Sequence, residues 1–130
     1  MQKDLIEKNP IIKLTIEFSL AVIDFCELLD TQRKFIVSKQ LLRSATSIGA
    51  NAMEAQNSGS KADFIHKMKI AAKEADETQY WLTLCDYSSL YPDCIDLWPK
   101  LESVQKLLNA ILSSSKRKNP ISFFLSFFIF

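Results

Sequence analysis

Residues 43–56 have the sequence RSATSIGANAMEAQ, a stretch of small and polar side chains with helical periodicity. The apolar positions in and just before it recur at intervals of four and three residues, which is the spacing of one face of an α-helix. These seam positions are Leu41, Ala45, Ile48, Ala52 and Ala55. A helix normally buries a face with larger side chains. The pattern therefore predicts a helix over residues 36–57 whose partner is equally small at the contact.

That partner is predicted over residues 61–90. Ser60 and Asp63 have the spacing of a capping box, which marks a helix N-terminus. A regular seam follows from Phe64 to Ser89, and alanines 71, 72 and 75 narrow its middle. Because both seams are rich in alanine, we expect the two helix axes to approach closely.

Two further amphipathic helices are predicted over residues 10–29 and 98–114, each with a proline near its first turn. The connections are short, and no stretch has the alternating pattern of a strand. Residues 1–118 are therefore predicted to form an all-α fold, an antiparallel up-down-up-down four-helix bundle.

The end of the chain follows a different pattern. Residues 119–130 contain ISFFLSFFIF after a Lys-Arg-Lys cluster. Ten apolar residues are about half of what a membrane-spanning helix needs. The segment fits a contact with a neighbouring subunit, an extension without a role or, with less weight, a peripheral membrane anchor. We do not expect a membrane partner.

Charge is unevenly distributed along the chain. Residues 31–73 hold eight basic and two acidic side chains, a net of +6. Residues 1–30 have a net charge of −3 and residues 74–115 a net charge of −5, although the whole chain is only +1. The middle of the chain is thus a candidate surface for an acidic partner or for the acidic flanks themselves.

Chemistry typical of enzymes is not evident. The single histidine, His66, lies among lysines, and no motif supplies a nucleophile with its base, so we expect no catalytic residue and no enzyme. Cys26, Cys85 and Cys94 lack metal-ligand spacing, and neither a metal nor a cofactor is expected. The thiols indicate a reducing compartment and the N-terminus has no signal peptide, so the expected location is the cytoplasm.

A polar stripe runs beside the small seam of the second helix. It consists of Arg43, Ser47, Asn51 and Glu54, spaced four, four and three residues apart. We interpret the stripe as helix-interface or subunit-interface chemistry, with Arg43 able to bind a carboxylate such as Glu74 or Glu77 through two hydrogen bonds. In an oligomer such pairs would form across subunits.

The two central helices resemble a bacterial four-helix-bundle family often labelled 23S rRNA intervening-sequence proteins. The resemblance covers about residues 10–115. Its motifs are the Arg-Ser-x-x-Ser-Ile-x-x-Asn block from Arg43, the Ser-x-x-Asp-Phe block from Ser60, and the Glu-x-x-Glu block from Glu74. Ala52 and Ala55 depart from the usual Ile and Gly of the pattern. The Phe-rich end has no counterpart in the family.

The resemblance implies a bundle that assembles as a ring, typically a homopentamer. Relatives include the accessory variability protein of diversity-generating retroelements, whose basic barrel binds nucleic acid and a reverse transcriptase, so a reverse transcriptase is a further implied partner. Two functions follow for this chain. The first is weak, sequence-independent binding of RNA or DNA by the basic surface of the two central helices, and the second is a protein-interaction scaffold without a nucleic-acid role. The nucleic-acid-binding candidates are Lys61, His66, Lys69, Lys73 and Arg43.

Overall fold

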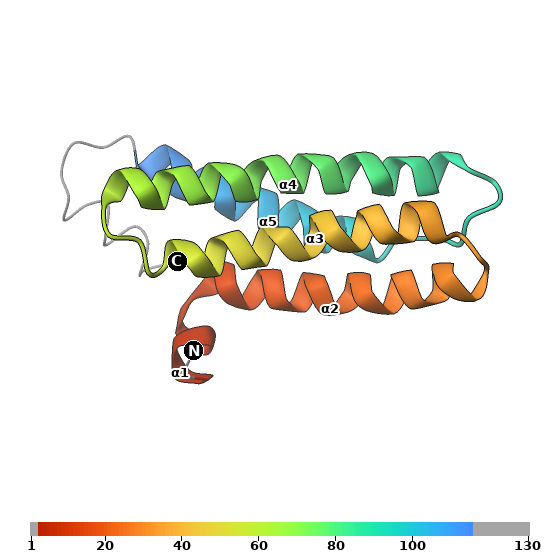
Figure 1. Cartoon of the computed structure of the whole chain (residues 1–130), viewed down its shortest axis with the longest axis horizontal. Coiled ribbons are helices and arrows are strands. Elements are labelled where there is room, and N and C mark those ends of the chain that lie inside the picture. Colours follow the sequence, from red (N-terminus) through yellow and green to blue (C-terminus); the bar gives the residue numbers. More distant parts are fainter. Residues whose placement is uncertain (1–2, 116–130) are drawn as a thin grey trace.

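The computed structural model describes residues 3–115, and all its regular elements within that range are helices. They are α1 (Lys3–Lys8), α2 (Pro10–Thr31), α3 (Phe35–Ala55), α4 (Lys61–Tyr87) and α5 (Leu97–Ser114). The four long helices lie side by side along one axis, and the chain reverses direction at each connection (Figure 1). The all-α bundle predicted from the sequence is therefore confirmed. The segment 119–130 lies outside the described residues.

The predicted bounds of the four long helices differ from the observed ones by at most three residues, and one element is additional. The short helix α1 was not predicted, and it precedes Asn9, which has extended backbone torsions and begins α2 with Pro10 at its first position. Helix α4 ends at Tyr87 and not near Leu90, because Ser88 adopts extended torsions. The Ser88 hydroxyl then accepts a hydrogen bond from the Leu90 amide at 3.3 Å, which favours a turn over another helical residue.

The α3–α4 contact is built from alanine. Ala45 and Ala52 on α3, and Ala71 and Ala75 on α4, are each at most 1% exposed. Larger side chains from the outer helices complete the same core. They include Phe18, Val22 and Leu29 on α2 and Leu101, Val104 and Leu108 on α5. The alanines let the central pair lie close, and Ile48 and Met68 of the same pair belong to one core with the side chains of the outer helices.

The α2–α3 contact also uses small and polar groups. A Cβ atom on Gly49 would lie 3.1 Å from the Cβ of Thr15, so the absence of a side chain there permits the close approach of the two helices. Near the other end of this pair, the Ser38 hydroxyl donates to the carbonyl of Cys26 at 3.2 Å. The Cys26 thiol donates in return to the carbonyl of Ser38 at 3.4 Å. Helix α2 therefore packs closely against α3 near its N-terminal end and is hydrogen-bonded to α3 near its C-terminal end.

The turn between α2 and α3 places Arg33 at a position that normally favours glycine. Its φ of 60° is left-handed. The Arg33 amide donates to the carbonyl of Asp30 at 3.0 Å, and the Lys34 amide donates to that of Leu29 at 2.9 Å. This pair of bonds is a Schellman motif, in which the left-handed residue is usually glycine because an L side chain is strained there.

Arg33→Gly should stabilise the protein. Relief of the left-handed strain, about 1–2 kcal/mol, exceeds the extra entropy that glycine loses on folding, and the net gain should be about 0.5–1 kcal/mol. Urea unfolding followed by circular dichroism measures it. Gln32→Gly is the matched control, since Gln32 has an ordinary φ of −95° and should lose stability. Equal effects of the two changes would contradict this account.

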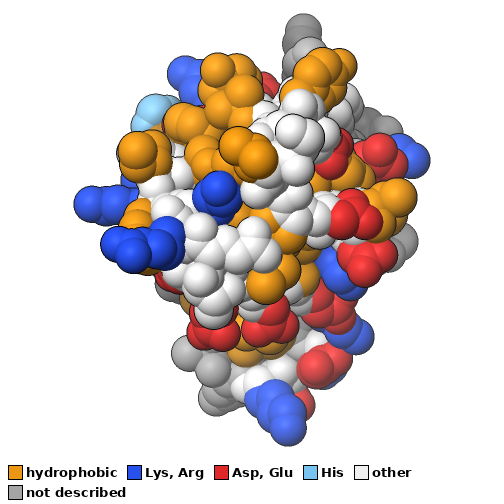
Figure 2. All heavy atoms as spheres, turned by 90° about the vertical axis from the view of Figure 1, so that its right-hand side faces the viewer, with side chains coloured by type: hydrophobic (Ala, Val, Ile, Leu, Met, Phe, Trp, Pro, Cys, Tyr) orange, Lys and Arg blue, Asp and Glu red, His pale blue; other side chains and the backbone are white. Residues whose placement is uncertain are grey.

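One end of the bundle remains apolar on its surface. Where α3 begins, α4 ends and the α4–α5 connection passes, large hydrophobic side chains are exposed to solvent (Figure 2). Tyr87 and Ile36 are 88% and 82% exposed. Among residues 3–115, no helix is long and apolar enough to cross a membrane.

Candidate nucleic-acid interface

Arg43 links the two central helices within one chain. From α3 its guanidinium contacts two carboxylates one turn apart on α4, with Nη1 lying 3.3 Å from Oε2 of Glu74 and Nη2 bonded to Oε2 of Glu77. The Arg43 side chain is 47% exposed, so the three charges lie at the surface. The hydrogen bond to Glu77 raises the pKa of the Arg43 guanidinium above its ordinary value. Arg43 is thus neutralised by its own chain and presents no unpaired positive charge to a phosphate.

Trp81 completes this cluster. Its indole nitrogen donates to Oε2 of Glu77 at 3.0 Å, across one turn of α4. That hydrogen bond is the main reason that the pKa of Glu77 is lowered, and Arg43 lowers it further. The carboxylate is therefore held in its charged form by one neutral and one cationic donor.

The rest of the polar stripe also stays within the chain. Glu54 accepts from the Lys67 ammonium of α4 at 3.1 Å, so both ends of the stripe pair with α4. Ser47 donates to the carbonyl of Arg43, and Asn51 donates to that of Ser47, both four residues back on the same helix. The ion pairs expected across subunits form between α3 and α4 of one chain, and a role of the stripe in an oligomer interface stays a prediction.

The remaining candidates lie on the outward face of α4. His66, Lys69 and Lys73 are exposed and recur at three and four residues, so they form a row about 10 Å long that we call the α4 basic row. Among residues 3–115, neither Lys69 nor Lys73 pairs with a carboxylate. Lys61, in the first turn of α4, is half-buried. The structure therefore separates the five predicted nucleic-acid residues into a solvent-facing row of three, the half-buried Lys61 and a compensated arginine.

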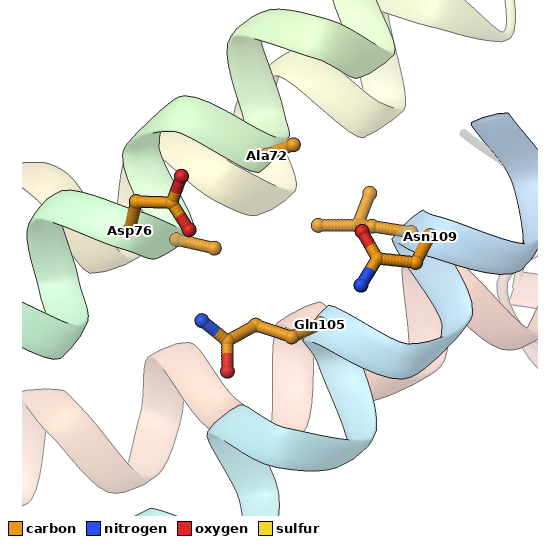
Figure 3. Close-up of a pocket in the computed structure, with 6 residues that line it drawn as sticks. Ala72, Asp76, Gln105 and Asn109 are labelled. Atoms are coloured by element: carbon orange, nitrogen blue, oxygen red, sulfur yellow. The ribbon is translucent and has the colours of Figure 1, made fainter.

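A shallow hollow of about 260 Å³ lies on the α5 side of α4. Ala72 lines it beside the polar side chains of Asp76, Gln105 and Asn109 (Figure 3). Gln105 also donates to Oε1 of Gln79 at 2.9 Å. One carboxylate and two amides can accept hydrogen bonds from a ligand but do not form a nucleophile with its base. In the described part of the chain, no three His, Cys, Asp or Glu side chains gather as metal ligands.

Trp81→Phe should reduce the acid sensitivity of the fold. Because the pKa of Glu77 is lowered in the folded state, its contribution to stability is present above its unfolded pKa, about 4.3, and is lost as the pH falls through the folded value. Without the indole donor the pKa of Glu77 rises toward its ordinary value. The difference in unfolding free energy between pH 6 and pH 3 should therefore be smaller in the variant.

Trp98→Phe is the control for this measurement, since the Trp98 indole nitrogen donates to no carboxylate in the described range. Carboxyl NMR titration of Glu77 gives the pKa directly. An unchanged pKa of Glu77 in Trp81→Phe would contradict the assignment.

Sequence reasoning missed two features of this site. Trp81 was not assigned to the cluster, although its position four residues after Glu77 is a spacing that brings side chains together on a helix. The buried hydrogen bond from Thr78 Oγ1 to Ser44 Oγ, 2.9 Å long, was also missed, because nothing in either helix alone shows that these two seam positions meet.

A close central helix pair with alanine seams and ion pairs along its flank defines an all-helical bundle protein. Comparison with known proteins gives its family. Residues 7–110 match the model of the 23S rRNA-intervening sequence protein family, and the chain belongs to that family. A solved structure from Bacteroides thetaiotaomicron, described as a protein of unknown function from the S23 ribosomal protein family, is similar, with 38% identity and a TM-score of 0.74. The similarity covers 78% of this chain and 97% of that one. No curated protein matches the chain.

Proposed function

We propose that this protein is a non-enzymatic bundle that assembles as a homo-oligomeric ring and binds RNA or DNA weakly, without sequence specificity. The observation that supports it is the α4 basic row, His66, Lys69 and Lys73, which faces solvent while Arg43 and Lys67 are paired with glutamates. Unpaired lysines on one helix face, with a histidine beside them, contact phosphates and do not read base edges.

The ring supplies what one row lacks. Two lysines and a histidine give only a weak phosphate contact, and repetition around a ring multiplies it through effective concentration. A ring is closed by a heterologous interface, in which two different surfaces of the subunit meet, and such an interface can leave the α4 basic row facing solvent.

The charge-reversal variant Lys69→Glu/Lys73→Glu tests the proposal. In fluorescence anisotropy with a labelled RNA or DNA duplex at low salt, we expect at least about tenfold weaker binding. The slope of log K against log salt should become shallower by about 2 for each subunit that contacts the duplex. Lys100→Glu/Lys106→Glu on α5 is the matched control, because it changes the same charge at two exposed positions of another helix.

The second candidate, a scaffold without a nucleic-acid role, is favoured by the exposed carboxylates on the outer face of α2, Glu17, Asp24 and Glu27, which would pair with the basic side of a neighbouring subunit. Under it, Lys69→Glu/Lys73→Glu would lower the oligomer mass in light scattering. Under the first proposal the variant keeps the oligomer mass of the wild type and loses its binding of nucleic acid. No binding by the assembled wild-type protein at low salt would end the nucleic-acid proposal. A reverse transcriptase partner stays a prediction from the family resemblance.

A further inference from the structure

The exposed apolar end of the bundle is a surface that the proposed function does not use. Six large hydrophobic side chains lie there, contributed by the first turn of α3, the last two turns of α4 and the α4–α5 connection. We call this surface the apolar end; its members are Phe35, Ile36, Leu84, Tyr87, Leu90 and Ile95. Their exposed fractions range from 37% for Leu84 to 88% for Tyr87.

These side chains contribute little to the fold of a single chain. The structure exposes eleven large hydrophobic residues between positions 3 and 115, and these six lie together at one end. Single exposed hydrophobic residues are ordinary on protein surfaces, whereas a contiguous group usually marks an interaction site. The six belong to three segments that only the folded bundle brings together, so helical periodicity does not explain their grouping.

The two sides of this apolar centre differ in net charge. On one side, Arg33 in the α2–α3 turn and Lys39 in the second turn of α3 are exposed cations, and Asp30 at the end of α2 is an exposed carboxylate. On the other side, three exposed carboxylates, Asp86, Asp93 and Asp96, come from the end of α4 and the connection to α5, and Lys100 in the first turn of α5 is an exposed cation. Figure 2 shows this end with cationic side chains at the left and centre and acidic ones at the right and along the lower edge, where further cations lie among them.

An apolar centre with cations on one side and carboxylates on the other is self-complementary. A twofold axis through the centre places the Arg33 and Lys39 side of one copy over the Asp86 and Asp96 side of the other, and the reverse. The hydrophobic residues of the two copies then bury each other, while the charges fix the rotation. A ligand of a single charge would meet repulsion on one side of this surface.

We infer that the apolar end binds the same end of a second copy of this chain, so that bundles pair end to end about a twofold axis. This contact is separate from the α4 basic row, which begins near the other end of α4. The end-to-end contact therefore doubles the number of chains in the oligomer that forms through the sides of the bundle.

The test is the oligomer mass of the full chain, measured by multi-angle light scattering over a concentration series. Ile36→Asp/Tyr87→Asp should halve the mass relative to wild type. The control Leu5→Asp replaces a hydrophobic residue that is 54% exposed on α1, outside the apolar end, and should leave the mass unchanged. Circular dichroism checks the fold of each variant. An unchanged mass in Ile36→Asp/Tyr87→Asp, or a decrease by a factor other than two, would overturn the twofold pairing.

Two charge-reversal variants provide a second test that does not depend on the hydrophobic changes. Arg33→Glu/Lys39→Glu and Asp86→Lys/Asp96→Lys should each lose the pairing alone, because one chain then has the same sign on both sides. Within residues 3–115, the Asp96 side chain makes no capping hydrogen bond, and Asp86 accepts one only from the Cys94 thiol at 3.0 Å, so circular dichroism of Asp86→Lys/Asp96→Lys checks that loss of this bond leaves the fold intact. Mixed in equal amounts, the two variants should restore the doubled mass, since both contacts across the axis become attractive.

A mixture that stays at half the wild-type mass would overturn the inference.

Deletion of residues 121–130 tests whether the Phe-rich segment at the end of the chain takes part in this pairing. The doubled mass should persist without that segment. If deletion removes the pairing as completely as Ile36→Asp/Tyr87→Asp does, the occupant of the apolar end is the Phe-rich segment and not the same end of a second copy.

Discussion

Ala45→Leu and Ala71→Leu should each lower the free energy of unfolding by about 3 kcal/mol, a large part of the stability of a domain of this size. Both alanines are fully buried in the α3–α4 seam. A leucine there has three more carbon atoms than the contact can hold, so the helices must separate or the side chain must leave its preferred rotamer. The added hydrophobic surface gives no compensation, because it has no space in which to pack.

Urea unfolding at equilibrium measures this loss. Ala50→Leu is the matched control, since it makes the same change on the exposed side of α3 and should alter stability by no more than about 0.5 kcal/mol. A normal unfolding midpoint for Ala45→Leu would mean that the central helices can separate at little cost, and would refute the close packing as a requirement of the fold.

The three thiols should be almost inert in the folded protein. Burial raises the pKa of Cys26 and of Cys85 to about 11. The pKa of Cys94 is raised to about 12, by burial and then by the hydrogen bond that its thiol donates to Asp86. The thiolate is the reactive form, and a rise of two units lowers its fraction at pH 8 by about 100-fold. Alkylation should therefore be at least about 100-fold slower than for an unfolded chain.

Iodoacetamide labelling followed by mass spectrometry tests this at each cysteine separately. In denaturing urea all three should react at the rate of an ordinary thiol, which controls for the reagent. Folded-state labelling of any one of them within tenfold of its rate in urea would show that its helix opens readily or that its pKa is not raised.

Helix positions could be predicted from the sequence because each helix carries a one-dimensional signal. The four-and-three spacing from Leu41 to Ala55 and the Ser60 cap are properties of short stretches, and the structure has α3 and α4 there. The end of α4 could not be placed in this way. The seam continues formally to Ser89, but Ser88 leaves the helix for a turn that its own hydroxyl stabilises.

The candidate site was predictable only in its composition. The sequence indicated that Arg43 belongs with Glu74 and Glu77, because a guanidinium beside two acids one turn apart is a favourable combination. Spacing along the chain does not say whether such groups meet within one chain or between two. The apolar end was not predictable at all, since its members come from three segments and share no period.

The hydroxyl pair of Ser44 and Thr78 has a consequence for the axial alignment of the central helices. The alanines at the contact offer few protruding side chains to set the offset of α3 against α4, so the larger Ile48 and Met68 and this hydrogen bond determine it. A slide by one residue, about 1.5 Å, would pull the two buried oxygens out of hydrogen-bond distance of each other, and Ser44 Oγ would keep only the carbonyl of Leu41 and Thr78 Oγ1 only that of Glu74. The lost bond costs about 0.5–1.5 kcal/mol. The bond therefore helps to select one offset between the two helices, and with it the height at which Lys69 and Lys73 stand relative to the rest of the bundle.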